Sequence, residues 1–100
     1  MKLVHMTFHF EFAETVENIL DRHNISAFAR YPMIEGKDAD GKHYGNKIFP
    51  GSITVVQAVV ADEAVEDLMD ALGAFRAEKP AHEHLEALIL PVERRLIDDR

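Results

Sequence analysis

The stretch Ile53-Thr54-Val55-Val56-Gln57-Ala58-Val59-Val60 decides the fold. Its β-branched residues are only lightly interrupted by polar ones, which is typical of a central, buried strand, and we place this strand at Ser52 to Ala61. Asp62 follows as a predicted N-cap of a helix, and Glu63 and Glu66 suit the positive end of that helix. The buried stripe of the helix is marked by apolar residues at helical spacing, namely Val65, Leu68, Met69, Leu72 and Phe75.

A strand and a helix precede this pair. Residues 1–10 alternate, which predicts a half-buried strand with Val4, Met6, Phe8 and Phe10 on one face and Leu3, His5, Thr7 and His9 on the other. Residues 12–23 then carry Val16, Ile19 and Leu20 at helical spacing. This helix is predicted to stop at His23-Asn24, because Asn tolerates the left-handed conformation that closes helices.

Two further strands complete the pattern. Residues 25–34 form one strand, in which Pro32 lacks an amide donor and therefore indicates an edge or an irregularity. The run Glu78-Lys79-Pro80-Ala81 ends the second helix. Residues 85–92 form the last strand, with Pro91 again marking an edge.

The order strand, helix, strand, repeated twice, predicts an α+β fold of the ferredoxin-like βαββαβ type. Such a fold has a four-stranded antiparallel sheet with both helices on one face, and 100 residues suffice for one such domain, residues 1–100. The second sheet face stays uncovered and carries apolar residues. An open apolar face on so small a protein predicts an oligomer, and we expect a homotrimer.

A segment rich in turn formers separates the second and third strands. Glu35 to Gly51 holds several Gly, Asp and Asn residues, and Asp40-Gly41 could turn a hairpin. The segment is longer than a tight turn requires. We therefore expect a mobile or functional loop at about 36–51.

Composition excludes several classes of function. A net charge of −7 argues against nucleic acid as a partner, and the absence of cysteine removes disulfides, thiolate metal sites and thiol nucleophiles. No run approaches the roughly 18 apolar residues of a membrane span, and the N-terminus lacks the apolar region of a signal peptide. These features predict a cytoplasmic protein.

No catalytic motif is present, so we do not expect an enzyme. The sequence lacks a nucleophile elbow, a phosphate loop and a His-Glu-x-x-His helix, and its two serines, Ser26 and Ser52, fall on predicted strands. A small enzyme on the ferredoxin-like scaffold, with His5 or His9 as general base, remains a less favoured alternative. His5 and His9 are more simply interface residues.

Two groups of side chains are candidate binding sites. His82 and His84 flank Glu83, and on a strand both imidazoles would lie on one face within reach of a Zn²⁺, Cu²⁺ or Ni²⁺ ion. A solvated strand start is the competing interpretation. In the long loop, Lys37, Lys42 and Lys47 form a basic island with His43 and Tyr44, suited to an anionic ligand or an acidic partner surface.

The chain resembles the nitrogen-regulatory PII proteins and their PII-like relatives over nearly its full length. The likeness lies in the order of elements, in the long loop from Glu35-Gly36-Lys37 to His43-Tyr44-Gly45-Asn46, and in an Ile/Val-rich strand before Asp62 and the pattern Val65-x-x-Leu68-Met69-x-x-Leu72. The resemblance implies a signalling homotrimer that binds a small effector between subunits and regulates a partner protein through the loop. It implies ligand-binding residues Gly36, Lys37, Gly51, Arg76 and Lys79, and partner-binding residues Lys42, His43, Tyr44 and Lys47.

One departure from the family keeps an alternative open. Family members that bind ATP or ADP carry a Gly-rich basic turn after the second helix, whereas residues 76–84 contain no Gly and so few backbone amides free to approach a phosphate. The related CutA-type trimers lack that turn, and metal response recurs among them. A divalent-metal-binding trimer is thus the alternative function, and the candidate cofactor is a divalent metal ion or an adenine nucleotide.

Overall fold

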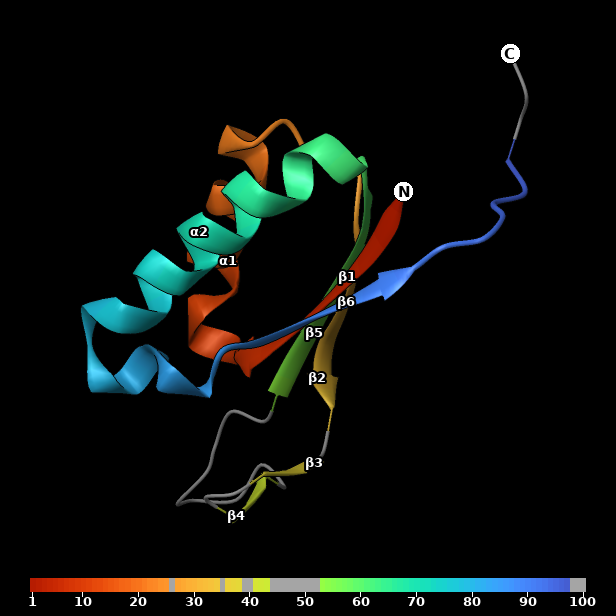
Figure 1. Ribbon diagram of the computed structural model, residues 1–100. Helices are drawn as coiled ribbons and strands as arrows, with labels where there is room; N and C mark the ends of the chain where they lie inside the picture. Colours follow the sequence, from red (N-terminus) through yellow and green to blue (C-terminus); the bar gives the residue numbers. More distant parts are fainter. Residues whose placement is uncertain (26, 35, 39–40, 44–52, 98–100) are drawn as a thin grey trace.

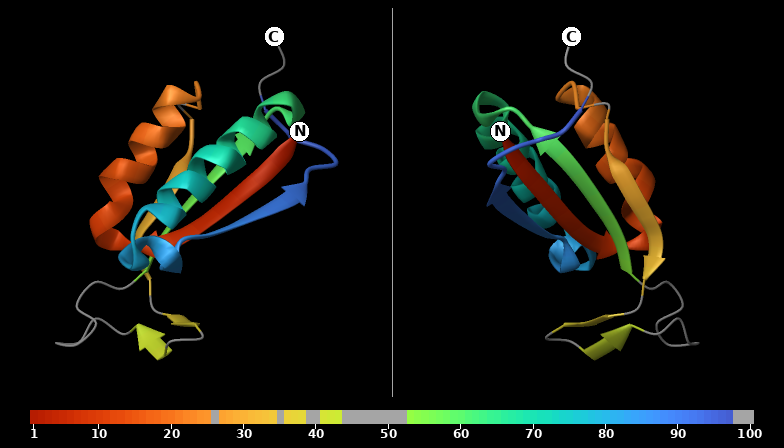
Figure 2. Two further views of the ribbon diagram at one scale, coloured as in Figure 1. Left: turned by 60° about the vertical axis from the view of Figure 1, so that its left-hand side comes forward. Right: turned by 90° about the vertical axis from the view of Figure 1, so that its right-hand side faces the viewer.

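The computed structural model describes residues 1–25, 27–34, 36–38, 41–43 and 53–97, with only the backbone described for 36–38 and 41–43. Four antiparallel strands form one sheet in the order β2-β5-β1-β6. Both helices cover one face of this sheet (Figures 1 and 2). The predicted ferredoxin-like fold is confirmed. The elements of this unit are β1 (Lys2–His9), α1 (Ala13–Arg22), β2 (Ala29–Ile34), β5 (Ile53–Val60), α2 (Asp62–Glu78) and β6 (Glu86–Pro91), with two 3-10 helices, η1 (Phe10–Phe12) and η2 (Pro80–His84).

The core lies between the sheet and the helices. The alternation of β1 is confirmed for Val4, Met6 and Phe8, which are buried. Phe10 is exposed, contrary to the prediction, because the strand ends at His9, whose ring accepts a hydrogen bond from the Glu11 amide and begins the turn of η1. The helices complete the core with Val16, Ile19 and Leu20 from α1 and Leu68, Leu72 and Phe75 from α2, while Val65 and Met69 pack at its margin.

The end of α1 explains where β2 begins. Asn24 takes the expected left-handed conformation, with φ 61°. Its amide donates to the Asp21 carbonyl (3.0 Å) and the Ile25 amide to the Leu20 carbonyl (2.9 Å), as in a Schellman motif. Because the Ile25 amide closes the helix and its side chain is buried in the core, β2 begins at Ala29 rather than at Ile25.

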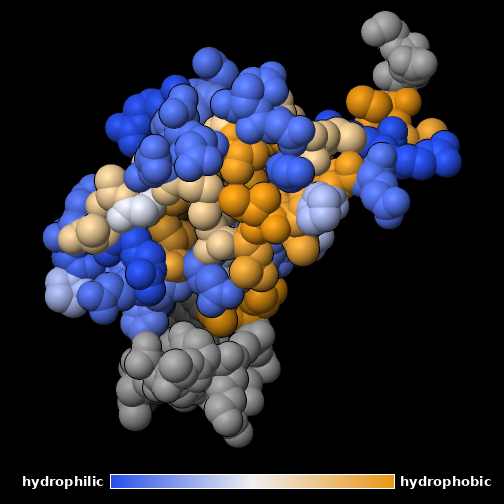
Figure 3. All heavy atoms as spheres, in the orientation of Figure 1, coloured by the Kyte–Doolittle hydropathy of each residue, from blue (hydrophilic) through white to orange (hydrophobic). Residues whose placement is uncertain are grey.

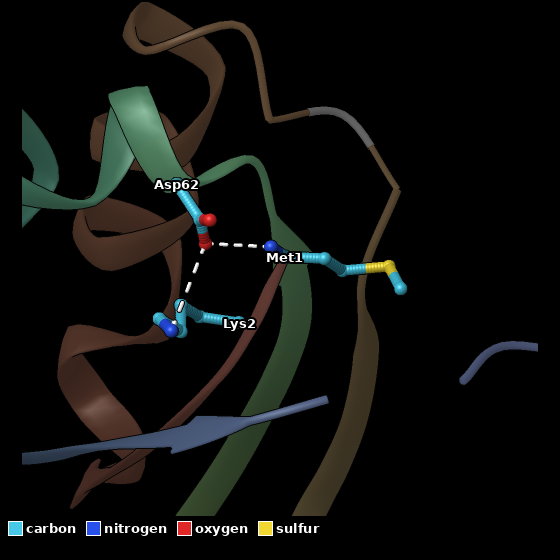
Figure 4. A network of polar contacts seen from close by, with 3 residues as sticks. All are labelled: Met1, Lys2 and Asp62. Carbon is cyan, nitrogen blue, oxygen red and sulfur yellow. Dashed lines mark hydrogen bonds and ion pairs between the residues drawn. The ribbon is translucent and has the colours of Figure 1, made fainter. Parts of the chain in front are cut away.

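The sequence predicts Asp62 as the N-cap of α2, and this prediction is wrong. Ala61 is the N-cap, and Asp62 is the first helical residue. The Asp62 carboxylate instead contacts the Met1 ammonium at 2.5 Å and Lys2 Nζ at 3.9 Å (Figure 4). The strand register causes this, since Lys2 pairs with Val60 and so brings the start of β1 beside the start of α2. The hydrogen bond from the ammonium lowers the pKa of Asp62.

Both proline-containing strands lie at the edges of the sheet, as predicted. In β2 the register shifts between the pairs Tyr31–Val55 and Ile34–Ile53, so two residues of β2 face one of β5, as in a bulge. The single β5 residue at this bulge is Thr54, and its hydroxyl donates to the Pro32 carbonyl at 2.6 Å. This contact satisfies a buried side chain and fixes the bulge.

The predicted loop contains a small hairpin. Strands β3 (Gly36–Asp38) and β4 (Gly41–His43) pair antiparallel, with Asp38 opposite Gly41. Gly41 therefore lies in a strand and not in the turn, contrary to the suggested Asp40-Gly41 turn. Tyr44, Lys47 and Gly51 lie outside the described residues, and the mobility of the loop stays a prediction.

The sheet face away from the helices is open and largely apolar. We call it the open face. Leu88 and Leu90 of β6 and Tyr31 of β2 are each about half exposed on it. The right-hand view of Figure 2 looks onto this face, and Figure 3 shows apolar residues gathered at the edge of the sheet. The register places on this face Leu3, His5 and Thr7 of β1, Val55, Gln57 and Val59 of β5, Glu86, Leu88 and Leu90 of β6, and Ala29 and Tyr31 of β2. No helix among the described residues is long and apolar enough to span a membrane.

Candidate functional site

One end of the sheet gathers most of the predicted site residues. There β1 ends and β5 begins, with His9 opposite Ile53, and β2 ends opposite the same residue at Ile34. The β3–β4 hairpin, the C-terminal end of α2 and η2 lie at this end as well (Figures 1 and 2). We call it the loop end. The structure thus places Gly36 and Lys37 at the same end of the sheet as Arg76, Lys79, His82 and His84.

Arg76 holds the corner between α2 and β6. It lies in the last turn of α2, and its Nε donates to the carbonyls of Glu83 (3.1 Å) and Leu85 (2.9 Å). Because the Arg76 Nε–H is shared by these two backbone carbonyls, it ties η2 and the start of β6 to the end of α2. The predicted anion-binding role of Arg76 therefore has to coexist with a structural one, and its exposed guanidinium keeps the positive charge at the surface.

His82 is a packing residue. Its side chain is only 4% exposed, and its ring stacks on Phe75 with centroids 3.9 Å apart and planes at 12°. Phe12 meets the same ring edge-on at 4.7 Å. The His82 Nδ1–H donates to the Phe75 carbonyl at 2.7 Å, which satisfies an acceptor near the end of α2. The imidazole thus joins η1, α2 and η2.

The predicted placement of His82 and His84 on a strand is wrong. They lie in η2, and a 3-10 helix has three residues per turn, so positions i and i+2 point in different directions. Accordingly His82 is buried and His84 is exposed. Among the described residues no group of three or more His, Asp or Glu side chains could hold a metal ion. The geometry that suggested a metal site is therefore not found in this part of the chain.

Two backbone amides at η2 are already engaged. The His82 amide donates to the Lys79 carbonyl (3.0 Å) and the Leu85 amide to the His82 carbonyl (3.1 Å), so these donors are used within the turn. The exposed charges around it are of both signs, with Arg76 and Lys79 among Glu78, Glu83 and Glu86. This arrangement differs from a Gly-rich cradle of free amides.

The hairpin carries two further basic residues of the predicted site, Lys37 and Lys42. The register sets Lys37 of β3 directly opposite Lys42 of β4, and Gly36 opposite His43. Two of the three lysines of the predicted basic island thus lie at paired positions of the hairpin backbone, and the island itself stays a prediction.

Two aromatic residues were not predicted as part of this region. Phe12 contacts His82 and Phe75, and at 6.3 Å it also contacts the ring of His9, which is the last residue of β1. The aromatic cluster of His9, Phe12, Phe75 and His82 therefore connects the end of β1 to the corner held by Arg76. The helical spacing of apolar residues in α2 identified Phe75 as buried. Phe12 lies at the boundary between a strand and a helix, where neither periodicity identifies a buried side chain.

The comparison with solved structures supports the fold. The chain is similar to CPII, a nitrogen regulatory PII-like protein from Thiomonas intermedia K12: a structure bound to ADP, AMP and bicarbonate has a TM-score of 0.71 and 17% identity, covering 89% of this chain and 88% of that one. A structure of CPII bound to ADP and bicarbonate gives 0.70 and 19%, covering 93% and 88%. The apo form gives 0.63 and 18%, covering 90% and 92%. No family model matches the sequence, and no curated protein matches it either. The resemblance to PII-like proteins is confirmed at the level of the fold.

Proposed function

We propose that this chain, which has the fold of the PII-like regulatory proteins, is a homotrimeric regulator that binds a small effector and is not an enzyme. The observation that carries the proposal is the likeness to ligand-bound CPII over about nine-tenths of both chains. Support comes from the loop end, where Arg76 and Lys79 of the corner lie at the same end of the sheet as the hairpin strands that carry Lys37 and Lys42.

The proposed effector site lies at the loop end, between subunits. It combines Gly36, Lys37 and Gly51 at the base of the loop with Arg76 and Lys79 of the corner. Solved CPII structures are bound to ADP, AMP and bicarbonate, so adenine nucleotides and bicarbonate are the first ligands to test. We expect the smaller anion, bicarbonate, to be favoured, because residues 76–84 contain no Gly and a polyphosphate needs more free backbone donors.

The open face is the proposed surface of self-association. Glu86 is its one charged residue, whereas the outer sides of both helices are rich in Asp and Glu. Copies of a protein with net charge −7 therefore meet with least repulsion on this face. We propose that the loop residues Lys42, His43, Tyr44 and Lys47 contact a partner protein with an acidic surface.

Two experiments test the proposal. Isothermal titration of the wild-type chain with ADP, AMP and bicarbonate should give binding of at least one ligand, and the double variant K37A/K79A should weaken it about tenfold or more, equal to about 1.4 kcal/mol. Arg22→Ala, which removes a charge at the C-terminal end of α1, is the matched control and should bind like wild type. No binding of any of the three ligands would overturn the effector site.

The second experiment tests the trimer. Leu88 and Ile89 are neighbours on β6 with similar exposure, 48% and 40%, but they lie on opposite faces. Leu88→Glu places a charge in the open face and should give monomers by light scattering, whereas Ile89→Glu should leave the trimer intact. A measured wild-type mass of 11.3 kDa, which is that of one chain, at a protein concentration of tens of micromolar would overturn the proposed trimer.

A further inference from the structure

The open face holds one polar pair near its middle. His5 of β1 and Gln57 of β5 lie directly opposite each other, and the Gln57 Nε2 is 2.9 Å from the His5 Nδ1. An amide nitrogen can only donate, so Nδ1 accepts and the ring carries its hydrogen on Nε2. Both side chains are already partly buried in the single chain. The pair is thus a hydrogen-bonded unit in which the imidazole is the acceptor.

The surroundings of this pair are almost entirely apolar. On β6 Leu88 lies opposite His5, and on β2 Ala29 lies opposite Gln57. The titratable groups of the open face near the pair are Glu86, diagonal to His5 on β6, Tyr31 on β2, and His9 further along β1; β5 contributes none. A positive charge on His5 would therefore have one possible carboxylate partner, and that one is not directly opposite.

We infer that His5 couples self-association of the chain on its open face to the loss of a proton. The inference rests on the proposed self-association and concerns its regulation. When a second copy covers the face, the pair is taken out of water among Leu, Val and Ala side chains. A neutral imidazole bonded to an amide tolerates this environment, whereas an imidazolium pays the desolvation cost of a buried charge and can no longer accept from the Gln57 amide.

The sign of the effect separates this mechanism from general electrostatics. Histidine side chains change charge in the range of pH 5 to 8. Protonation of all six histidines would bring the formal net charge from −7 to −1, which reduces repulsion between copies and on its own favours assembly at low pH. A proton on His5 acts in the opposite direction. Where each subunit must release one proton to assemble, each pH unit costs up to about tenfold in association per subunit.

Sedimentation velocity at pH 7.5 and pH 5.5, over a range of concentrations, tests the inference. The concentration of half-assembly of the wild-type chain should rise about tenfold or more at pH 5.5. His5→Gln keeps a polar partner for Gln57 but cannot be charged, so its assembly should be unchanged or stronger at pH 5.5. His23→Gln, at the end of α1 away from the sheet, should behave like wild type. Circular dichroism at both pH values shows that each variant is folded.

The outcomes are distinguishable. Wild-type assembly that is equal or stronger at pH 5.5, or a fall that His5→Gln shares, refutes the coupling and leaves the trimer standing. A wild-type chain that is monomeric at pH 7.5 refutes the proposed self-association and the coupling together. Should His5→Gln fail to fold, His5→Leu replaces it, with the same expectation of pH-independent assembly.

Discussion

Replacing His82 by Ala is the sharpest test of the corner at the loop end. The substitution removes the hydrogen bond to the Phe75 carbonyl, worth about 0.5 to 1.5 kcal/mol, and the ring contacts with Phe75 and Phe12, worth about 0.5 to 1.5 kcal/mol each. It also leaves a cavity in a site that is only 4% exposed. Together these losses should lower the free energy of unfolding by about 2 to 4 kcal/mol.

Urea unfolding followed by circular dichroism at one protein concentration measures this loss, and the urea midpoint should fall by roughly 1 to 2 M. His82→Phe keeps the ring contacts and loses the hydrogen bond, so it should cost only about 1 kcal/mol. His84→Ala, on the exposed side of the same 3-10 helix, is the matched control and should stay within about 0.5 kcal/mol of wild type. If His82→Ala and His84→Ala cost the same, the packing role of His82 is wrong.

Two further predictions concern the sheet and the start of α2. Thr54→Val removes the bond to the Pro32 carbonyl at the bulge and should destabilise the chain by about 1 to 3 kcal/mol in the same urea assay, whereas Thr7→Val on the open face should change it little; equal effects would argue against the bulge contact. The lowered pKa of Asp62 means that its ionised form is favoured in the folded chain, so its contribution to stability is present above pH 4 or so and is lost as the pH falls through its folded pKa. Melting curves from pH 6 to pH 2.5 should show that a small advantage of wild type over Asp62→Asn shrinks as the pH falls below about 4, and an advantage that stays constant over this range would contradict this.

Local patterns predicted the elements of the fold well because their causes are local. The alternation of Val4, Met6 and Phe8 and the helical spacing of Leu68, Leu72 and Phe75 identify the buried faces without knowledge of the partners. The left-handed Asn24 follows from its own backbone preference. The open face then follows from the order of the elements.

The misplaced residues depend on contacts between distant parts of the chain. Asp62 is the first residue of α2 and not its cap, and its carboxylate contacts the Met1 ammonium. Only the pairing of β1 with β5 brings this ammonium near. His82 was expected at the start of a strand, but it lies in a 3-10 helix whose segment is held by Arg76 and by stacking on Phe75. Spacing in the sequence therefore indicated the two imidazoles but could not show that one of them is inside the core.

The pairing of Ile34 with Ile53 has a practical consequence for protein engineering. The chain leaves the sheet at one of these residues and returns at the other, so the sheet itself holds the two anchor points of the intervening segment together. The entropic cost of closing a longer segment between fixed anchors rises only slowly with its length. A fluorescent reporter domain inserted between these anchors should therefore leave the sheet intact, and its emission would convert events at this end of the molecule into an optical signal.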